Sequence, residues 1–348
     1  MVARLHLRRH VTVVRMRSAH TQVESLVRDA LVWDNHACLP LTPGDDRFLP
    51  ELQRYRSSGV DAVSINIGFG EQSIEQHFRM AAHFRSWLLK RPEEFLMVRS
   101  AGDVMQAKRD GRLAVMFDIE GANAIGDQLS LISLYYDIGV RWMLMAYNRN
   151  NRVGGGCLDD DRGLTAFGRD VVAEMNRVGM VPCCSHCGKR TALDVIETSA
   201  TPVIFSHSNP RAIWDHPRNI DDEVMRACAE RGGVIGINGV GRFLGPNDTS
   251  SATVARHIDY AARLVGPDHV ALGLDYVFDR SELAAFIAAD PAMFGENARA
   301  AAKTGLDFVA PEQLTEIVDS LSSLGHAESD IRKILGLNLL RIAHEVWK

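Results

Sequence analysis

The sequence predicts an α/β protein folded as a (β/α)8 barrel. Eight short apolar runs follow one another along the chain, and segments with helical periodicity separate them. Buried strands that alternate with helices indicate a parallel sheet covered on both faces, and eight strands are enough to close a barrel. A third observation supports the barrel, because polar residues recur where the runs end.

The runs are rich in aliphatic and β-branched residues and cover 31–36, 61–67, 113–120, 140–147, 180–186, 202–207, 233–238 and 269–275. Helical patterns between them include 163–179 and 251–266. A doubly wound open sheet is the alternative, but no glycine-rich phosphate-binding turn follows the first run. We therefore expect residues 26–348 to form one barrel domain.

Residues 1–25 are expected to precede the barrel as a basic extension. Its arginines are Arg4, Arg8, Arg9, Arg15 and Arg17. The longest apolar stretch there is VTVV, too short for the core of a signal peptide or for a membrane span. We interpret the segment as lying on the surface or moving freely, with membrane contact as the alternative.

The charge and the cysteines narrow the class of protein. A formal net charge of −5 makes nucleic acid an unexpected partner. The six cysteines are unevenly grouped and do not resemble the disulfide framework of a small secreted domain, so we expect a cytoplasmic protein. Cys184 and Cys187 form a CxxC that could be redox-active or half of a structural zinc site. No second ligand pair accompanies it, so we favour buried thiols, with Cys184 and His186 on one face of an extended strand.

Four ends of runs carry groups that bind metals. His36, Glu120, His186 and His207 each close a different run, and the carboxyl ends of barrel strands meet at one face. Three imidazoles and a carboxylate suit Zn²⁺. Glu120 could bridge two ions about 3.5–4 Å apart, which would activate a water molecule between them.

Asp275 closes the last run and is placed to accept a proton from that water and pass it to a leaving amine. Taken alone, each of these residues also fits a structural role, such as a hydrogen-bonded histidine or a helix cap. Independent structural residues need not all fall on strand ends of one face. The joint pattern therefore favours a metal-dependent hydrolase.

These residues lie in segments that resemble the renal (membrane) dipeptidases of metallopeptidase family M19, relatives of the amidohydrolase barrels. The matching segments are WDNHACLPL (33–41), FDIEGANAI (117–125), GVRWMLMAYNRNN (139–151), MNRVGMVPCCSH (175–186), PVIFSHSNPRA (202–212), HPRNIDDE (216–223), GPDHVALGLD (266–275) and ILGLNLLRIA (334–343). They occur in the family's order from about residue 30 to the end.

The resemblance implies a zinc-dependent dipeptidase, commonly a homodimer, that often accepts a D-residue at the C-terminal position. It assigns His36 to a first zinc, Glu120 to both zincs, and His186 with His207 to a second. Asp275 would be the catalytic carboxylate. Arg218 would bind the substrate carboxylate, a role that suits a planar bidentate donor. We also expect Tyr147 and its neighbour Asn148 to contact the substrate.

Two positions depart from the family's pattern. Cys38 occupies the place of a metal-binding aspartate; a thiolate could replace it as a ligand, or Cys38 could turn away and leave a single metal. Tyr147 stands where the family often has a histidine that stabilises the oxyanion, and its hydroxyl could donate a similar hydrogen bond. These departures keep two alternatives open: a hydrolase of a non-peptide amide, lactam or lactone, and an inactive barrel with a binding role.

Overall fold

The computed structural model of the chain describes residues 21–295, 303 and 305–348. Most of the predicted basic extension lies outside these residues. Residues 21–29 are helical and lead directly into the first strand. The predicted boundary at residue 25 thus falls inside a helix, and the extension as a separate unit stays a prediction.

Eight parallel strands form a closed ring, which confirms the (β/α)8 barrel. In ring order they are β1 (Trp33–Cys38), β2 (Ala62–Phe69), β4 (Leu113–Glu120), β5 (Val140–Leu144), β6 (Val181–Cys183), β7 (Ile204–Phe205), β8 (Val234–Asn238) and β9 (Val270–Gly273). Pairing of β1 with β9, where Asp34 lies opposite Leu272, closes the ring.

Two further strands were not predicted. β3 (Phe95–Met97) pairs with the start of β4, and β10 (Tyr276–Val277) pairs with the end of β1. Strands this short carry no readable alternation of apolar and polar residues.

Several predicted runs extend beyond the strand that they contain. Run 180–186, for example, keeps strand geometry only over Val181–Cys183. The backbone then leaves the sheet, and His186 adopts a φ of 64°. The polar residues at the ends of these runs consequently lie on the loops that follow the strands, where barrel active sites are built.

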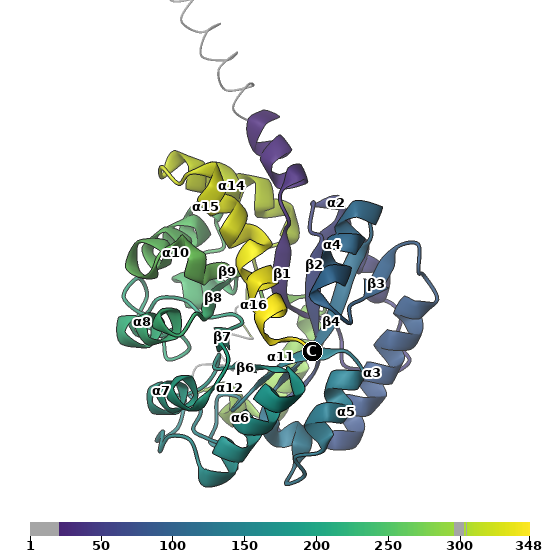
Figure 1. Cartoon of the computed structure of the whole chain (residues 1–348), viewed down its shortest axis with the longest axis vertical. Helices are drawn as coiled ribbons and strands as arrows, with labels where there is room; N and C mark the ends of the chain where they lie inside the picture. Colours follow the sequence, from purple (N-terminus) through teal and green to yellow (C-terminus); the bar gives the residue numbers. More distant parts are fainter. Residues whose placement is uncertain (1–20, 296–302, 304) are drawn as a thin grey trace, which may run out of the picture.

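Helices surround the ring of strands (Figure 1). The α-helices are α2 (Gln53–Ser57), α3 (Ile74–Leu89), α4 (Ala101–Asp110), α5 (Leu131–Asp137), α6 (Ala166–Val178), α7 (Lys189–Thr198), α8 (Asp222–Glu230), α9 (Gly241–Leu244), α10 (Ser251–Val265), α11 (Arg280–Ala289), α12 (Pro291–Phe294), α14 (Leu314–Ser323), α15 (Glu328–Arg332) and α16 (Asn338–Val346). Short 3₁₀ helices are η1 (Leu49–Leu52), η2 (Ala122–Ile125), η3 (Pro267–His269) and η4 (Pro311–Gln313), and a π-helical turn, η5 (Lys333–Leu337), precedes α16.

Capping residues explain where several of these helices begin and end. The Ser250 side chain accepts a hydrogen bond from the backbone N–H of Thr253 at the start of α10. Gly179 ends α6 in the left-handed conformation, with a φ of 95°. Within the described part of the chain, no helix combines the length and the apolar character that crossing a membrane requires.

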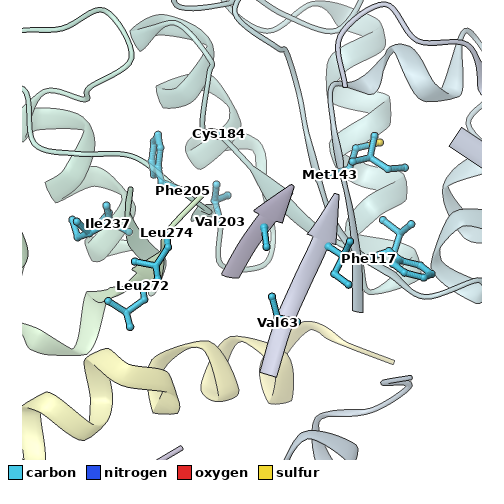
Figure 2. Packing of buried hydrophobic residues seen from close by; sticks show 14 of the residues in the cluster. Val63, Phe117, Met143, Cys184, Val203, Phe205, Ile237, Leu272 and Leu274 are labelled. Atoms are coloured by element: carbon cyan, nitrogen blue, oxygen red, sulfur yellow. The ribbon is translucent and has the colours of Figure 1, made fainter. Parts of the chain in front are cut away.

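Alternation along β4 separates the core from the site. Leu113, Val115, Phe117 and Ile119 belong to the large apolar core that includes residues of the surrounding helices. Figure 2 shows Val63 and Phe117 in this packing. The intervening residues Ala114 and Met116 belong to a second apolar cluster, with Trp33, Trp142 and other residues of the strands. Asp118 and Glu120 continue the same face of β4 toward its carboxyl end.

Helix α16 covers the opposite end of the barrel. Its apolar residues Leu339, Ile342 and Val346 pack in the cluster that contains the first residues of several strands, Trp33 among them. The Trp33 ring also contacts Trp347, with centroids 5.8 Å apart. Because this end is filled by apolar side chains, the carboxyl end is left for the polar site.

Candidate metal centre and substrate pocket

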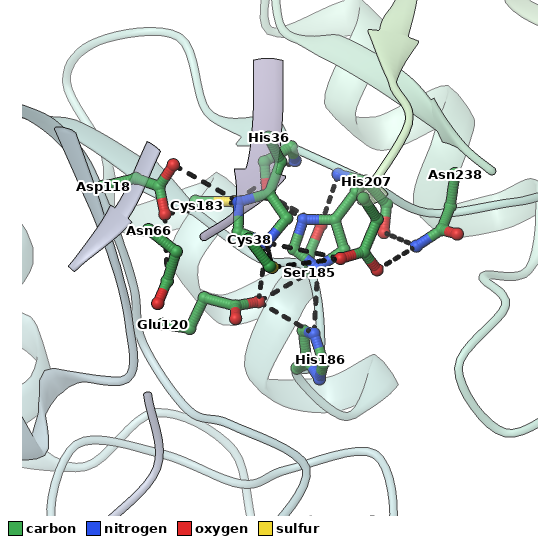
Figure 3. Close-up of polar contacts among 12 residues, drawn as sticks. His36, Cys38, Asn66, Asp118, Glu120, Cys183, Ser185, His186, His207 and Asn238 are labelled. Atoms are coloured by element: carbon green, nitrogen blue, oxygen red, sulfur yellow. Dashed lines mark hydrogen bonds and ion pairs between the residues drawn. The ribbon is translucent and has the colours of Figure 1, made fainter. Parts of the chain in front are cut away.

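Three imidazoles converge on one carboxylate oxygen at the carboxyl end of the barrel (Figure 3). Glu120 Oε1 lies 3.5 Å from Nε2 of His36, 3.2 Å from Nε2 of His186 and 3.2 Å from Nε2 of His207. The Nε2 atoms of His186 and His207 are 2.9 Å apart. All four side chains are buried. The predicted ligands, which come from β1, β4 and the loops after β6 and β7, are thus brought together.

Each imidazole has a different partner at its other ring nitrogen. His36 Nδ1 lies 3.3 Å from the Asp118 carboxylate, His186 Nδ1 lies 2.6 Å from Asn148 Oδ1, and His207 Nδ1 lies 2.8 Å from Ser206 Oγ. The sequence reasoning did not identify these partners. One signal was present for Asp118, because it lies two residues before Glu120 and therefore shares its face of β4. No comparable signal marked Asn148 or Ser206 for this role.

This arrangement fits a bound cation. Asp118 accepts a hydrogen bond from Nδ1 of His36, and Asn148 Oδ1 accepts one from Nδ1 of His186, because the Asn148 amide nitrogen donates elsewhere, to the Met293 carbonyl. When both rings are neutral, as metal ligands must be, their Nε2 atoms present lone pairs toward the Glu120 carboxylate, which is also an acceptor. Buried acceptors that face one another without a donor repel, and a metal ion resolves that repulsion.

Cys38 and Asp275 extend the cluster on the side of His36. Cys38 Sγ lies 3.4 Å from His36 Nε2 and 3.6 Å from Asp275 Oδ1. His36, Cys38 and Asp275 form a second group whose ligand atoms are close enough to hold one ion. The other oxygen of Asp275 accepts a hydrogen bond from the Asn238 side chain at 2.8 Å, which orients the carboxylate. Cys38 therefore does not turn away from the site.

The backbone at the site is strained. Among the described residues, four that are not glycine have a positive φ, and three of them, Asn148, His186 and Asp275, belong to the site, with φ values of 57°, 64° and 56°. Side chains with a Cβ rarely adopt this conformation, and such strain tends to gather at functional sites. The strained turns aim these three side chains toward the pocket rather than along the sheet.

Two glycines make room for the loop that carries His207. A Cβ on Gly236 would lie 2.2 Å from the Ser206 carbonyl oxygen, and one on Gly273 would lie 1.9 Å from it. Any side chain at either position would clash with the Ser206 carbonyl and displace the backbone next to His207. These glycines are therefore part of what positions the site.

Burial and charge set the protonation of the cluster. Burial lowers the pKa of His186 to about 3, with a further contribution from Arg218, and burial together with the charge on His36 lowers the pKa of His207 well below its usual value. Both rings are therefore neutral, as ligands must be. Burial also opposes charge on His36, but Asp118, Cys38 and Glu120 outweigh it and raise the His36 pKa.

The carboxylates and the thiol respond in different ways. Burial would raise the pKa of Glu120, yet the charge on His36 and the close contacts with the three histidine rings hold it well below its usual value. Burial raises the pKa of Asp275 to about 6 and raises that of Cys38 strongly. Without a cation Cys38 is a neutral thiol, and a bound metal would favour the thiolate.

A cavity of about 820 Å³ opens above the cluster. Its lining includes Tyr147, Asn148 and Arg218 in addition to Glu120, His186 and Asp275. The Tyr147 ring stacks on His186 with centroids 4.3 Å apart, and burial followed by the charges of Glu120 and Asp275 raises the Tyr147 pKa. Tyr147 thus remains a hydrogen-bond donor beside the ligands.

Arg218 is a buried residue of the cavity lining. One of its terminal nitrogens donates to the His207 carbonyl at 3.2 Å, and its Nε has no partner among the described residues. Asn148 differs, because its oxygen serves His186 and its nitrogen serves the Met293 carbonyl. Asn148 lines the cavity, but its amide is already engaged at both ends.

Cys184 does not lie on the same face as His186, in contrast to the alternation expected for an extended strand. All six cysteines are unpaired. Cys184 packs in the core that includes the outer helices, whereas His186 lines the cavity, so the two do not share a face as predicted. The strand ends at Cys183, and the positive φ at His186 breaks the alternation.

Comparison with known proteins places these features in one family. The profile of the membrane dipeptidase family, peptidase family M19, matches residues 20–284. A dipeptidase of Claviceps purpurea, tcpJ, is 28% identical over 329 residues, which cover 87% of this chain and 72% of that protein. An amidohydrolase of Pseudomonas aeruginosa superposes with a TM-score of 0.85 at 26% identity, over 93% of this chain and 99% of the other. A metallopeptidase of Rhodobacter sphaeroides, bound to a phosphinate mimic of L-Ala-D-Ala, has a TM-score of 0.74 at 22% identity and covers 92% of this chain and 100% of its own.

Proposed function

Because this chain belongs to the membrane dipeptidase family, peptidase family M19, we propose that it is a zinc enzyme that hydrolyses the amide bond of dipeptides. The family and the metallo-dipeptidase class follow from the match over most of the chain. The observation that carries the finer proposal is the convergence of three Nε2 atoms on Glu120, with Asp275, Tyr147 and Arg218 around the same cavity.

We assign two metal positions. His36, Cys38 and Glu120 would hold one ion, and Glu120, His186 and His207 would hold the other. When bound, the metal polarises the amide carbonyl and lowers the pKa of water at the site. Neutral imidazoles, one thiolate and one shared carboxylate suit zinc better than a hard, oxygen-seeking cation.

The residues of this chain supply the remaining roles. Asp275, oriented by Asn238, accepts the proton that the attacking water loses and returns it to the leaving amine. The Tyr147 hydroxyl donates to the carbonyl oxygen as negative charge develops there. Arg218 pairs with the substrate carboxylate through its fork of donors. Asn148 and Asp118 keep His186 and His36 in the tautomer that ligation needs.

The substrate assignment draws support from one relative. The Rhodobacter sphaeroides metallopeptidase was determined with a phosphinate mimic of L-Ala-D-Ala. A dipeptide has one carboxylate and one scissile amide, which match Arg218 and the metal cluster of this chain. We expect a homodimer, as in the family, and size-exclusion chromatography with light scattering would test it.

Cys38 and Tyr147 favour a second candidate. Cys38 replaces the family's aspartate with a softer ligand, and Tyr147 replaces its histidine with a phenol. A site with these two residues could also hydrolyse a non-peptide amide, a lactam or a lactone.

The deciding experiment combines metal analysis with a substrate panel. Protein purified with zinc supplied should carry at least one equivalent, and it should release amino acids from some L,L- or L,D-dipeptides in a reaction that a chelator stops. Intact dipeptides alongside rapid turnover of lactams or lactones would favour the second candidate. Zinc below about half an equivalent would make the chain a barrel with a binding role only.

A further inference from the structure

The cavity above the metal cluster is large for a small dipeptide. Its volume of about 820 Å³ lies toward the upper end of the range of about 300–1,000 Å³ for pockets that bury drug-sized ligands. Much of the lining beyond the cluster is apolar, and four of its aromatic residues contact one another on one side of the cavity. The cavity can therefore receive more than two small side chains.

Four aromatic rings form that side, which we call the aromatic wall: Phe69, Tyr147, Phe286 and Phe294. Phe69 is central, with ring centroids 5.2 Å from Tyr147, 5.1 Å from Phe286 in an edge-on contact, and 6.1 Å from Phe294. All four residues are only partly buried and line the cavity. Their rings therefore still offer apolar surface that a ligand can cover.

The aromatic wall lies across the mouth of the barrel from Arg218. Phe69 ends β2, and Arg218 follows β7. In the ring order β1, β2, β4, β5, β6, β7, β8, β9, strands β2 and β7 are four places apart in both directions, so they are opposite each other. The metal cluster lies between them on the floor of the cavity. A substrate whose carboxylate pairs with Arg218 thus extends across the cluster toward the aromatic wall.

The acidic side chains near the aromatic wall are already engaged. Asp279 caps α11 by accepting from the backbone N–H groups of Ser281 and Glu282. Glu282 accepts from the backbone N–H of Leu41 with both oxygens, at 3.0 Å each. Both carboxylates are thus held by backbone N–H groups, Asp279 through Oδ1 and Glu282 through both oxygens. The apolar rings of this side of the cavity therefore suit a neutral, apolar group.

We propose that the aromatic wall is the subsite for the acyl side of the scissile amide, and that it selects substrates with a large aromatic or long aliphatic group there. The group is either the side chain of an N-terminal residue, as in a Phe-Xaa dipeptide, or the chain of an N-acyl amino acid. Both present the same chemistry to Phe69, Phe286 and Phe294. The inference rests on the proposed function, because it uses Arg218 and the cluster to orient the substrate.

The test compares substrates that share one C-terminal residue. Dipeptides with Gly, Ala, Leu or Phe at the N-terminus, and N-acetyl, N-hexanoyl and N-octanoyl derivatives of the same amino acid, are assayed with the zinc-loaded enzyme. Full burial of a Leu or Phe side chain should raise kcat/KM over Gly by about 10- to 150-fold. A rise among dipeptides but not acyl derivatives identifies a peptide substrate, and the converse identifies an N-acyl amino acid. Equal rates for Gly and Phe, together with equal rates for acetyl and octanoyl, would overturn the proposal.

Variants of the wall separate selectivity from folding. The selectivity is the ratio of kcat/KM for the dipeptide with N-terminal Phe to that for the dipeptide with N-terminal Gly. Phe286→Ala and Phe294→Ala should lower this ratio by about 10-fold or more, and Phe286→Leu should retain most of it. Phe243→Ala is the matched control, because Phe243 lines the same cavity on the side of Arg218, with the guanidinium 5.3 Å from its ring. It should change rates for all substrates alike and leave the ratio intact. Loss of the ratio in Phe243→Ala but not in Phe286→Ala would contradict the assignment.

Calorimetry distinguishes failure of this inference from failure of the proposed function. If no amide is hydrolysed, the proposed function fails, yet N-octanoyl amino acid should still bind at least about 10-fold more tightly than N-acetyl, and Phe286→Ala should remove the difference. Hydrolysis of dipeptides without any apolar preference would instead leave the function standing and reject the subsite. If no amide is hydrolysed, equal binding of both derivatives would reject the subsite.

Discussion

Cys38 Sγ lies 3.4 Å from Nε2 of His36 and 3.6 Å from Oδ1 of Asp275. A tetrahedral zinc ion with Zn–S of about 2.3 Å and Zn–N of about 2.0–2.1 Å keeps its ligand atoms about 3.5 Å from one another. The separations within this group are therefore those of a ligand set. The family's pattern has a metal-binding aspartate at the position that Cys38 occupies.

Cobalt substitution tests whether Cys38 is a ligand. The Co(II) protein should show a near-ultraviolet thiolate-to-cobalt charge-transfer band that disappears in Cys38→Ser and Cys38→Asp. Cys38→Asp should still bind two metals, with greater tolerance for Mn²⁺, because a carboxylate is a harder donor than a thiolate. Cys157→Ser is the matched control, since that half-buried thiol lies near Asn148 outside the cluster and its removal should leave the band unchanged. A band that persists in Cys38→Ser would exclude the thiol from the metal site.

The barrel and the metal ligands could be predicted from the sequence, because both follow from short apolar runs and from the residues at their ends. The run LAVMFDIE predicted β4 to the residue, since it is a long, mostly apolar run between Arg112 and Gly121. Its final residue, Glu120, was therefore expected at the carboxyl end of the barrel, together with the three histidines predicted as metal ligands. The shorter strands β6 and β7 ended earlier than predicted, because the backbone leaves the sheet after Cys183 and Phe205 while the polar residues that follow stay buried.

The side chains that contact the metal ligands and line the cavity could not be predicted from the pattern of the sequence. The contact between Asn148 and His186 depends on a left-handed backbone at both residues, and neither is glycine. The aromatic wall joins Phe69 to Phe286 and Phe294, which are more than 200 positions later in the chain. Side-chain partners that meet through the tertiary fold leave no periodic signal.

Removal of the Asp118 carboxylate should weaken metal binding without direct loss of a ligand. Asp118 accepts from His36, from the Ser64 hydroxyl at 2.7 Å and from the Asn66 amide at 3.1 Å, so it is held rigidly. Asp118→Ala should reduce zinc affinity by about 10- to 100-fold, as measured by competition with a chromophoric chelator. Asp127→Asn, on an exposed side chain, serves as the control. If zinc affinity is unchanged while the metal-free protein melts at a lower temperature, Asp118 is a structural residue only.

Asp275→Asn should separate metal binding from turnover. The amide keeps the size of the side chain and can still contact Asn238, but it cannot accept a proton from water. We expect zinc content close to that of the wild type and a fall in kcat of at least about 10²-fold. Full activity in this variant would remove Asp275 from the mechanism. Loss of one zinc equivalent would instead identify Asp275 as a ligand beside His36.

Acid should destabilise the fold partly through a histidine outside the site. His257 on α10 is fully buried, donates from Nε2 to the Leu244 carbonyl at 3.0 Å, and has no partner at Nδ1 among the described residues. Burial lowers its pKa from 6.5 to about 4. The folded state then binds fewer protons than the unfolded state between these values, so stability is lost as the pH falls from about 6.5 to about 4.

At about 1.4 kcal/mol for each pH unit, this loss is at most about 3.5 kcal/mol. Urea unfolding at about pH 7.5 and about pH 4.5 measures it. His257→Gln keeps a donor for Leu244 but has no titrating group, so the difference in unfolding free energy between the two pH values should shrink. An unchanged difference would show that other groups account for the acid sensitivity.

Arg218→Lys should affect substrate recognition more than the metal centre. Arg218 holds the His207 carbonyl with one nitrogen and, in the proposed role, pairs with the substrate carboxylate through the others. Lysine keeps the charge but loses the planar fork, so kcat/KM for dipeptides should fall by about 10- to 150-fold, mostly through KM, while zinc content is retained. The matched control is Arg211→Lys, because Arg211 is paired with Asp221 outside the cavity. A dipeptide amide, which lacks the carboxylate, should already be a poor substrate of the wild type and should lose little more in Arg218→Lys. If the acid and the amide lose rate equally, Arg218 acts through the position of His207 and does not recognise the carboxylate.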